Sequence, residues 1–82
     1  VIYPALGLAA EAGEVANKVK KIMRDGELDR EGIADEIGDC LWYIAALCRD
    51  LNIDMETVAY DNLEKLHSRQ KRGTLRGNGD KR

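Results

Sequence analysis

Two pairs of carboxylates stand out in this 82-residue chain, because each pair has helical spacing and lies beside apolar residues. Glu11 and Glu14 form the first pair, and Glu36 and Asp39 form the second. Residues three apart are neighbours on a helix surface, so each pair should present two carboxylates side by side. A carboxylate next to an apolar stripe is costly unless something pairs with it, which makes both pairs candidates for chemistry.

Four carboxylates that meet between packed helices repel one another, and divalent cations with oxygen ligands would reverse this repulsion. Mg²⁺ suits such ligands best and Mn²⁺ is the next choice. A di-iron site would need two Glu-x-x-His pairs. The only histidine is His67, so the chain offers a single such pair, Glu64 with His67, and the sequence argues against that alternative.

Three helices should position these carboxylates. Apolar periodicity predicts a first helix over about residues 5–24, which Asp25-Gly26 should end. It predicts a second helix that starts after an Asp29 N-cap and runs to about Leu51, and a third that follows an Asp54 N-cap and ends before Gly73. The short connection between the first two favours antiparallel packing. Each acidic pair contains a glycine, Gly13 or Gly38, and two such helix-weakening residues in matched positions suggest close backbone approach.

The fold class predicted from composition is all-α, because 44% of the residues are apolar, phenylalanine is absent, and good helix formers dominate. A chain of this size buries only about 60% of its unfolded surface. The segment 40–48 carries no charge and should be covered on nearly all sides. We therefore expect an antiparallel helical bundle, with three helices in this chain, completed by oligomerisation as a homodimer or a dimer of dimers.

Charge and apolar runs suggest where the protein works. No run approaches the roughly 20 apolar residues that cross a bilayer, and no signal-peptide pattern opens the chain, so we expect a cytoplasmic protein without a membrane partner. Residues 1–61 carry 6 Lys and Arg against 13 Asp and Glu, whereas residues 62–82 carry 7 against 2. We expect a helical domain over residues 1–72 and a flexible basic C-terminal tail over residues 73–82.

The chain resembles the MazG-like branch of the all-α nucleoside triphosphate pyrophosphohydrolases, whose metal signature is E-x-x-E followed, after a spacer, by E-x-x-D. The matching segments are Gly7–Val15, Gly38–Tyr43 and Asn62–Arg69. Members of this family usually carry another helical segment before the position of Tyr3, so the resemblance leaves the selectivity for the base undecided.

The resemblance implies Mg²⁺-dependent hydrolysis of a nucleoside triphosphate to a monophosphate and pyrophosphate, with a nucleotide-pool house-cleaning role. It makes Glu11, Glu14, Glu36 and Asp39 the metal ligands. We expect Glu11 also to act as the catalytic base, because its central place on the apolar stripe should make it the least solvated of the four.

Five further residues are expected to bind the substrate. Lys65 and Arg69 would meet the polyphosphate, although a basic helix end is also favourable to the helix dipole. Asn62 lies in an apolar stripe, where a buried amide needs a partner such as sugar or phosphate. Lys18 could reach a phosphate or pair with a neighbouring glutamate, and Tyr43 could stack on a base or pack in the core.

Two alternatives remain. A related phosphohydrolase acting on phosphoribosyl-ATP would use a similar carboxylate site. A non-catalytic helical interaction module would leave the acidic pairs in water and bind nucleic acid through its basic tail. The net charge of −2 and the low aromatic content argue against nucleic acid as a partner.

Overall fold

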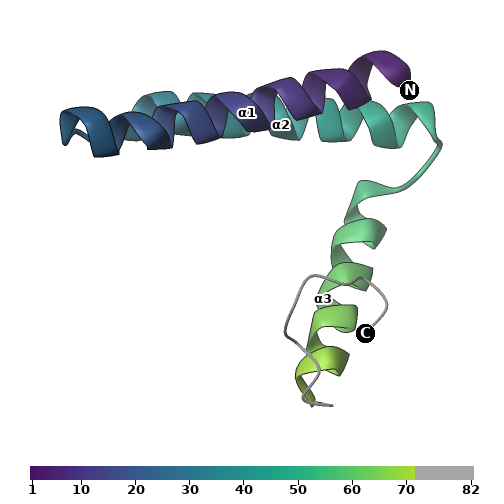
Figure 1. Ribbon diagram of the computed structural model, residues 1–82. Coiled ribbons are helices and arrows are strands. Elements are labelled where there is room, and N and C mark those ends of the chain that lie inside the picture. Colours follow the sequence, from purple (N-terminus) through teal and green to yellow (C-terminus); the bar gives the residue numbers. More distant parts are fainter. Residues whose placement is uncertain (72–82) are drawn as a thin grey trace. The chain divides into compact units, whose positions relative to one another are not determined.

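The computed structural model describes residues 1–71, and these form three α-helices (Figure 1). Helix α1 spans Ile2–Asp25, α2 spans Arg30–Asp50 and α3 spans Met55–Lys71. The all-helical class expected from the sequence is confirmed within this range. The expected tail over residues 73–82 lies outside the described residues, and so does the last residue of the expected 1–72 domain.

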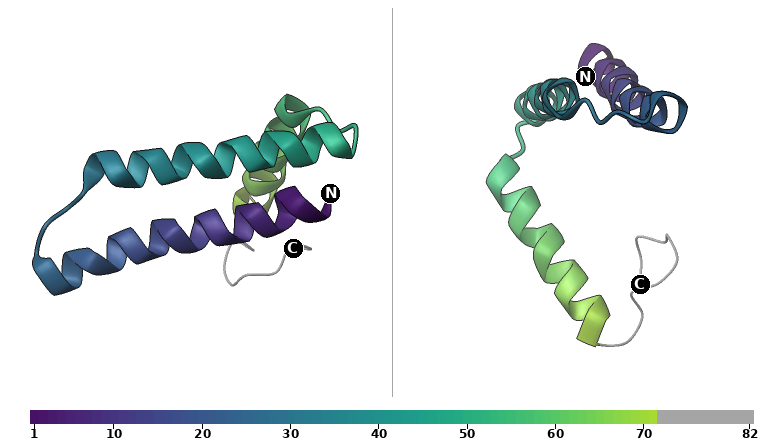
Figure 2. Two further views of the ribbon diagram at one scale, coloured as in Figure 1. Left: turned by 90° about the horizontal axis from the view of Figure 1, so that it is seen from above. Right: turned by 90° about the vertical axis from the view of Figure 1, so that its left-hand side faces the viewer.

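The chain divides into two units, Val1–Asn52 and Ile53–Arg82. The first contains α1 and α2, which pack along each other and run in opposite directions (Figures 1 and 2). The amino group of Val1 lies 2.8 Å from the Asp50 carboxylate, so the start of α1 adjoins the end of α2. The antiparallel pair predicted from the short connection is therefore present.

Local signals set the reversal between α1 and α2. Gly26 ends α1 with φ of 74°, a left-handed conformation that glycine adopts without steric cost, and its N–H donates to the Ile22 carbonyl. Asp29 then caps α2, because its side chain accepts a hydrogen bond of 3.0 Å from the Gly32 N–H. Both signals were predicted. Helix α1 starts nearer the N-terminus than expected and carries Pro4 in its first turn, where the missing N–H is tolerated.

Helix α3 belongs to the second unit and begins at the predicted cap. The Asp54 carboxylate accepts a bond of 3.3 Å from the Thr57 N–H and one of 2.6 Å from the Thr57 hydroxyl. Asn52 has φ of 56° in the turn before it. No described helix is long and apolar enough to cross a membrane.

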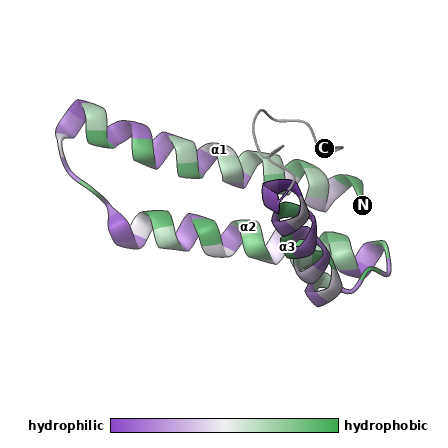
Figure 3. Cartoon of the chain, turned by 90° about the horizontal axis from the view of Figure 1, so that it is seen from below, coloured by the Kyte–Doolittle hydropathy of each residue, from purple (hydrophilic) through white to green (hydrophobic). Residues whose placement is uncertain are grey.

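The expected burial of α2 does not occur within the chain. Ala46 is buried, but Leu41 and Trp42 on the same uncharged segment are 55% and 61% exposed. Apolar residues also alternate with polar ones along both helices (Figure 3). Two helices cover only one stripe of each other, so the rest of the apolar surface of α2 faces outward.

The expectation of close backbone approach at Gly13 and Gly38 is wrong within the chain. A side chain added at either position would meet no atom within 4 Å. These glycines are therefore not explained by the packing of α1 against α2, although each stands beside an acidic pair.

Candidate metal centre

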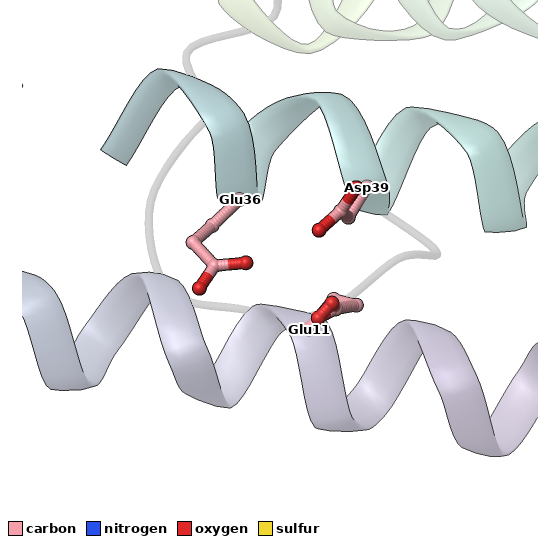
Figure 4. Close-up of side chains that lie close together, drawn as sticks. All are labelled: Glu11, Glu36 and Asp39. Atoms are coloured by element: carbon pink, nitrogen blue, oxygen red, sulfur yellow. The ribbon is translucent and has the colours of Figure 1, made fainter. Parts of the chain in front are cut away.

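Three of the four carboxylates come together between α1 and α2. Glu11 projects from α1, while Glu36 and Asp39 project from α2 toward it (Figure 4). One carboxylate oxygen from each residue lies within 4.8 Å of those of the other two. We call these three residues the carboxylate cluster. Glu11 and Glu36 are half-buried and Asp39 is exposed, so the cluster lies at the edge of the interface between the helices.

Glu14 lies outside the cluster. Its side chain is exposed, yet its charge still raises the pKa of both Glu11 and Glu36, so it stands close enough to affect them. Positions three apart differ by about 60° around a helix. The α1 pair is therefore split between one acid inside the cluster and one beside it, and the assignment of Glu14 as a ligand stays a prediction.

The cluster makes two of its own members hard to ionise. Desolvation raises the pKa of Glu11 above its ordinary value of 4.5, and the charges of Glu36, Asp39 and Glu14 raise it further. Desolvation likewise raises the pKa of Glu36, where Lys18 opposes it and Glu14 and Asp39 add to it. A cation at this point would remove both effects, since it favours the charged form of each carboxylate.

The donor set fits a hard divalent cation. Mg²⁺ takes oxygen ligands at about 2.0–2.1 Å, so two oxygens on one ion are at most about 4.2 Å apart. The three oxygens already lie within 4.8 Å of one another, so a small rotation of the side chains would bring them to this separation. Three carboxylates would then occupy part of an octahedral shell and leave positions for water and phosphate oxygens.

Lys18 is half-buried, and its charge lowers the pKa of Glu36 across the helix interface. The sequence suggested that Lys18 pairs with Glu14 or reaches a phosphate. It did not predict that the charge of Lys18 acts on Glu36 of α2. Lys18 places a positive charge beside the carboxylate cluster.

Tyr43 lies at the Glu11 and Asp39 end of the cluster. A hydrogen bond with Tyr3 raises the pKa of its phenol, and desolvation and the charges of Tyr3, Glu11 and Asp39 raise it further. Its ring makes edge contacts with Tyr3 and Trp42 at centroid distances of 6.1 and 5.1 Å. The sequence reading missed Tyr3, although its place two turns before Glu11 puts it on the same side of α1.

The other predicted substrate residues belong to the second unit. Asn62 and Lys65 on α3 are exposed, so the burial expected for the Asn62 amide is wrong within this chain. Arg69 is buried at 6% exposure and already takes part in an interaction. Their roles toward a substrate stay predictions.

Comparison with known proteins gives two matches. Residues 5–74 match the family described as the MazG nucleotide pyrophosphohydrolase domain. The "Gene 37 protein" of Mycobacterium phage L5 is 46% identical over 85 aligned residues, which cover 98% of this chain and 75% of that protein. No solved structure matches the chain significantly.

The pH dependence of stability follows from the raised pKa values of Glu11 and Glu36. Above the ordinary value of 4.5 the unfolded chain releases protons that the folded cluster still holds, so stability falls as pH rises through the raised values. Metal-free protein should therefore melt at a higher temperature at about pH 5 than at about pH 7. Asp25 and Asp50 have pKa values lowered from 3.8, so their opposite effect falls below this window.

Thermal melts of metal-free protein and of Glu11→Gln across this range would check the effect. The neutral amide has no proton to release, so its melting temperature should change less with pH. A slope in the variant equal to that of the unmutated chain would contradict the assignment.

Amide substitutions should separate the cluster from Glu14. In metal-free protein, Asp39→Asn removes a repelling charge from the cluster and should raise the melting temperature, whereas Glu14→Gln should raise it less because Glu14 lies outside. Millimolar Mg²⁺ should stabilise the unmutated chain by mass action and should stabilise Asp39→Asn much less. Melting curves with and without Mg²⁺ give both comparisons, and equal Mg²⁺ responses in all three proteins would rule out a cation site at the cluster.

Proposed function

This chain belongs to the MazG nucleotide pyrophosphohydrolase domain family, and we propose that it hydrolyses nucleoside triphosphates to monophosphates and pyrophosphate at the carboxylate cluster. The single observation that carries the proposal is the convergence of Glu11, Glu36 and Asp39 within 4.8 Å. An acidic cluster with raised pKa values is costly to folding, which is expected of a site built to bind a cation and a substrate.

The cluster and Glu14 are proposed to hold Mg²⁺, with Mn²⁺ as a possible substitute. When bound, the cation would supply positive charge to the phosphate oxygens and favour ionisation of a water molecule. Glu36 and Asp39 would orient it from α2, and Glu11 from α1. Lys18 would add a positive charge beside Glu36, suited to a phosphate oxygen of the same substrate.

Glu11 is proposed as the general base. It would accept a proton from the water whose oxygen attacks a phosphorus of the α–β linkage, while the bond from phosphorus to the bridging oxygen breaks and pyrophosphate leaves. Its half-buried place in the cluster sets it beside the proposed cation, whose bound water it would deprotonate. Lys65 and Arg69 are proposed to bind the polyphosphate, and Asn62 the sugar or a phosphate.

A second copy is proposed to complete the bundle. Leu41 and Trp42 on α2 and Leu6 on α1 are more than half exposed, and in the first unit only Pro4 and Ala46 are buried. So little burial cannot offset the conformational entropy lost by 52 ordered residues. The open space at Gly38 leaves room for a neighbouring chain beside the acidic pair of α2.

In the cell, we propose that the protein works in the cytoplasm in nucleotide-pool house-cleaning, with deoxynucleoside triphosphates as its substrates. The preferred base and sugar would follow from a panel of canonical and oxidised triphosphates. Phosphoribosyl-ATP belongs in the same panel, because a related phosphohydrolase would use a similar site.

The products test the reaction. With Mg²⁺, the chain should convert a triphosphate to a monophosphate and pyrophosphate, measured by chromatography, and Glu11→Gln should lower kcat by about 10²–10⁴-fold. Glu31→Gln, which neutralises an acid in the first turn of α2 outside the cluster, should leave the rate unchanged. Release of a diphosphate and phosphate, or an active Glu11→Gln, would refute the assigned chemistry. Salt-sensitive binding of nucleic acid without any hydrolysis would favour the interaction-module alternative.

Self-association is tested by sedimentation velocity at micromolar concentration. The unmutated chain should sediment as a dimer or a larger assembly. Leu41→Glu should shift it toward monomer and lower its melting temperature, because a charge would replace an exposed apolar side chain that the assembly would bury. A stably folded monomer would contradict the proposal.

A further inference from the structure

Gly7 on α1 lies directly against the ring of Tyr43 on α2. A methyl group at Gly7 would stand 2.5 Å from Cζ and 2.7 Å from Cδ1 of that ring, and closer still to Cε1. Carbon atoms in contact are normally about 3.5–4.0 Å apart. Any larger residue at position 7 therefore requires the Tyr43 ring to move.

The ring is a rigid group with neighbours on other sides. Tyr3 makes an edge contact with it from α1, and Trp42 makes another from α2. A methyl group at Gly7 would push the ring away from α1, and both neighbours are more than 60% exposed, so they can give way. Displacement would carry its hydroxyl away from Tyr3 and from the carboxylate cluster.

Gly7 is not explained by the needs of α1 itself. Glycine is a poor helix former compared with alanine, and α1 has a second interior glycine, Gly13, whose surroundings are open. Only Gly7 is required by a close approach. The two positions thus offer the same substitution on one helix with opposite surroundings.

Gly7 and Tyr43 also lie in line with the cluster. Gly7 stands one turn before Glu11, and Tyr43 stands one turn after Asp39. Because α1 and α2 are antiparallel, these two steps lead toward the same end of the site. The contact between Gly7 and Tyr43 is therefore the packing layer adjacent to the carboxylates.

We propose that Gly7 is a positioning residue, whose missing side chain seats the Tyr43 ring on α1. The Tyr43 hydroxyl is thereby held beside the cluster, where it exchanges its hydrogen bond with Tyr3 for one that it donates to a phosphate oxygen of the nucleotide. This inference rests on the proposed function. A phenol suits the role, because it is a neutral donor at physiological pH and adds no further negative charge to a crowded acidic site. Tyr43 would touch the substrate, and Gly7 would act only through Tyr43.

The contact between Gly7 and the Tyr43 ring can be tested without measuring catalysis. Trp42 is the only tryptophan of the chain and contacts Tyr43, so its emission reports movement of that ring. Gly7→Ala should change the Trp42 emission and lower the melting temperature, whereas Gly13→Ala should leave the emission unchanged and raise the melting temperature. If Gly7→Ala alone does not fold, Gly7→Ala in a Tyr43→Ala background should fold as well as Tyr43→Ala, because the ring is gone.

The positioning role is tested by a kinetic cycle on the unmutated chain, Gly7→Ala, Tyr43→Phe and the double variant. Loss of a hydrogen bond to a charged phosphate should raise KM about tenfold in each single variant, with kcat and the Mg²⁺ requirement little changed. The double variant should also show about a tenfold rise, since moving a ring that has lost its hydroxyl costs nothing more. Gly13→Ala should keep the KM of the unmutated chain.

An active unmutated chain with an unaltered KM in Gly7→Ala would overturn the inference and leave the proposed function standing. A rise of about a hundredfold in the double variant would also overturn it, because Gly7 would then act independently of the Tyr43 hydroxyl. No nucleotide hydrolysis by the unmutated chain would overturn both proposals, although the Trp42 measurement would still show whether the ring is seated on Gly7.

Discussion

The mutual repulsion of three carboxylates within 4.8 Å is the constraint on which the first unit depends. Glu11 meets Glu36 and Asp39 only if α1 and α2 run antiparallel in one register. The tight reversal at Gly26 and the Asp29 cap fix where each helix ends and begins, and so fix that register. Local turn chemistry thus decides which acids face one another.

The repulsion between the carboxylates also bears on the stability of the first unit. An apolar interface could offset the cost of the cluster, but α1 and α2 leave about half of their large apolar residues exposed. We propose two sources of additional stability for the folded first unit. One is a cation at the carboxylates, and the other is a second copy of the chain on the apolar surface. Both act by binding the folded state, so substrate site and assembly would stabilise the same pair of helices.

Sequence reasoning predicted those features that depend on neighbouring residues. Gly26, Asp29 and Asp54 mark the helix ends because left-handed turns and N-caps need these residue types. The acidic pairs were recognised because i,i+3 spacing fixes a face. How deeply a side chain lies in an interface depends on residues that are distant in the sequence. Spacing along one helix therefore could not show that Glu14 lies outside the cluster or that Asn62 is exposed. For the same reason it could not show that Gly13 and Gly38 face open space. Nor could it show that Tyr43 rests on Gly7, because that contact depends on the register between two helices.

We propose above all that the carboxylate cluster binds a divalent cation. Paramagnetic Mn²⁺, added in small amounts to isotope-labelled protein, broadens the nuclear magnetic resonance signals of residues near the bound ion. Broadening should centre on Glu11, Glu36 and Asp39, and excess Mg²⁺ should reverse it by competing for the same oxygens. Broadening centred on acidic residues elsewhere, or spread evenly over the chain while the cluster is unaffected, would contradict the account.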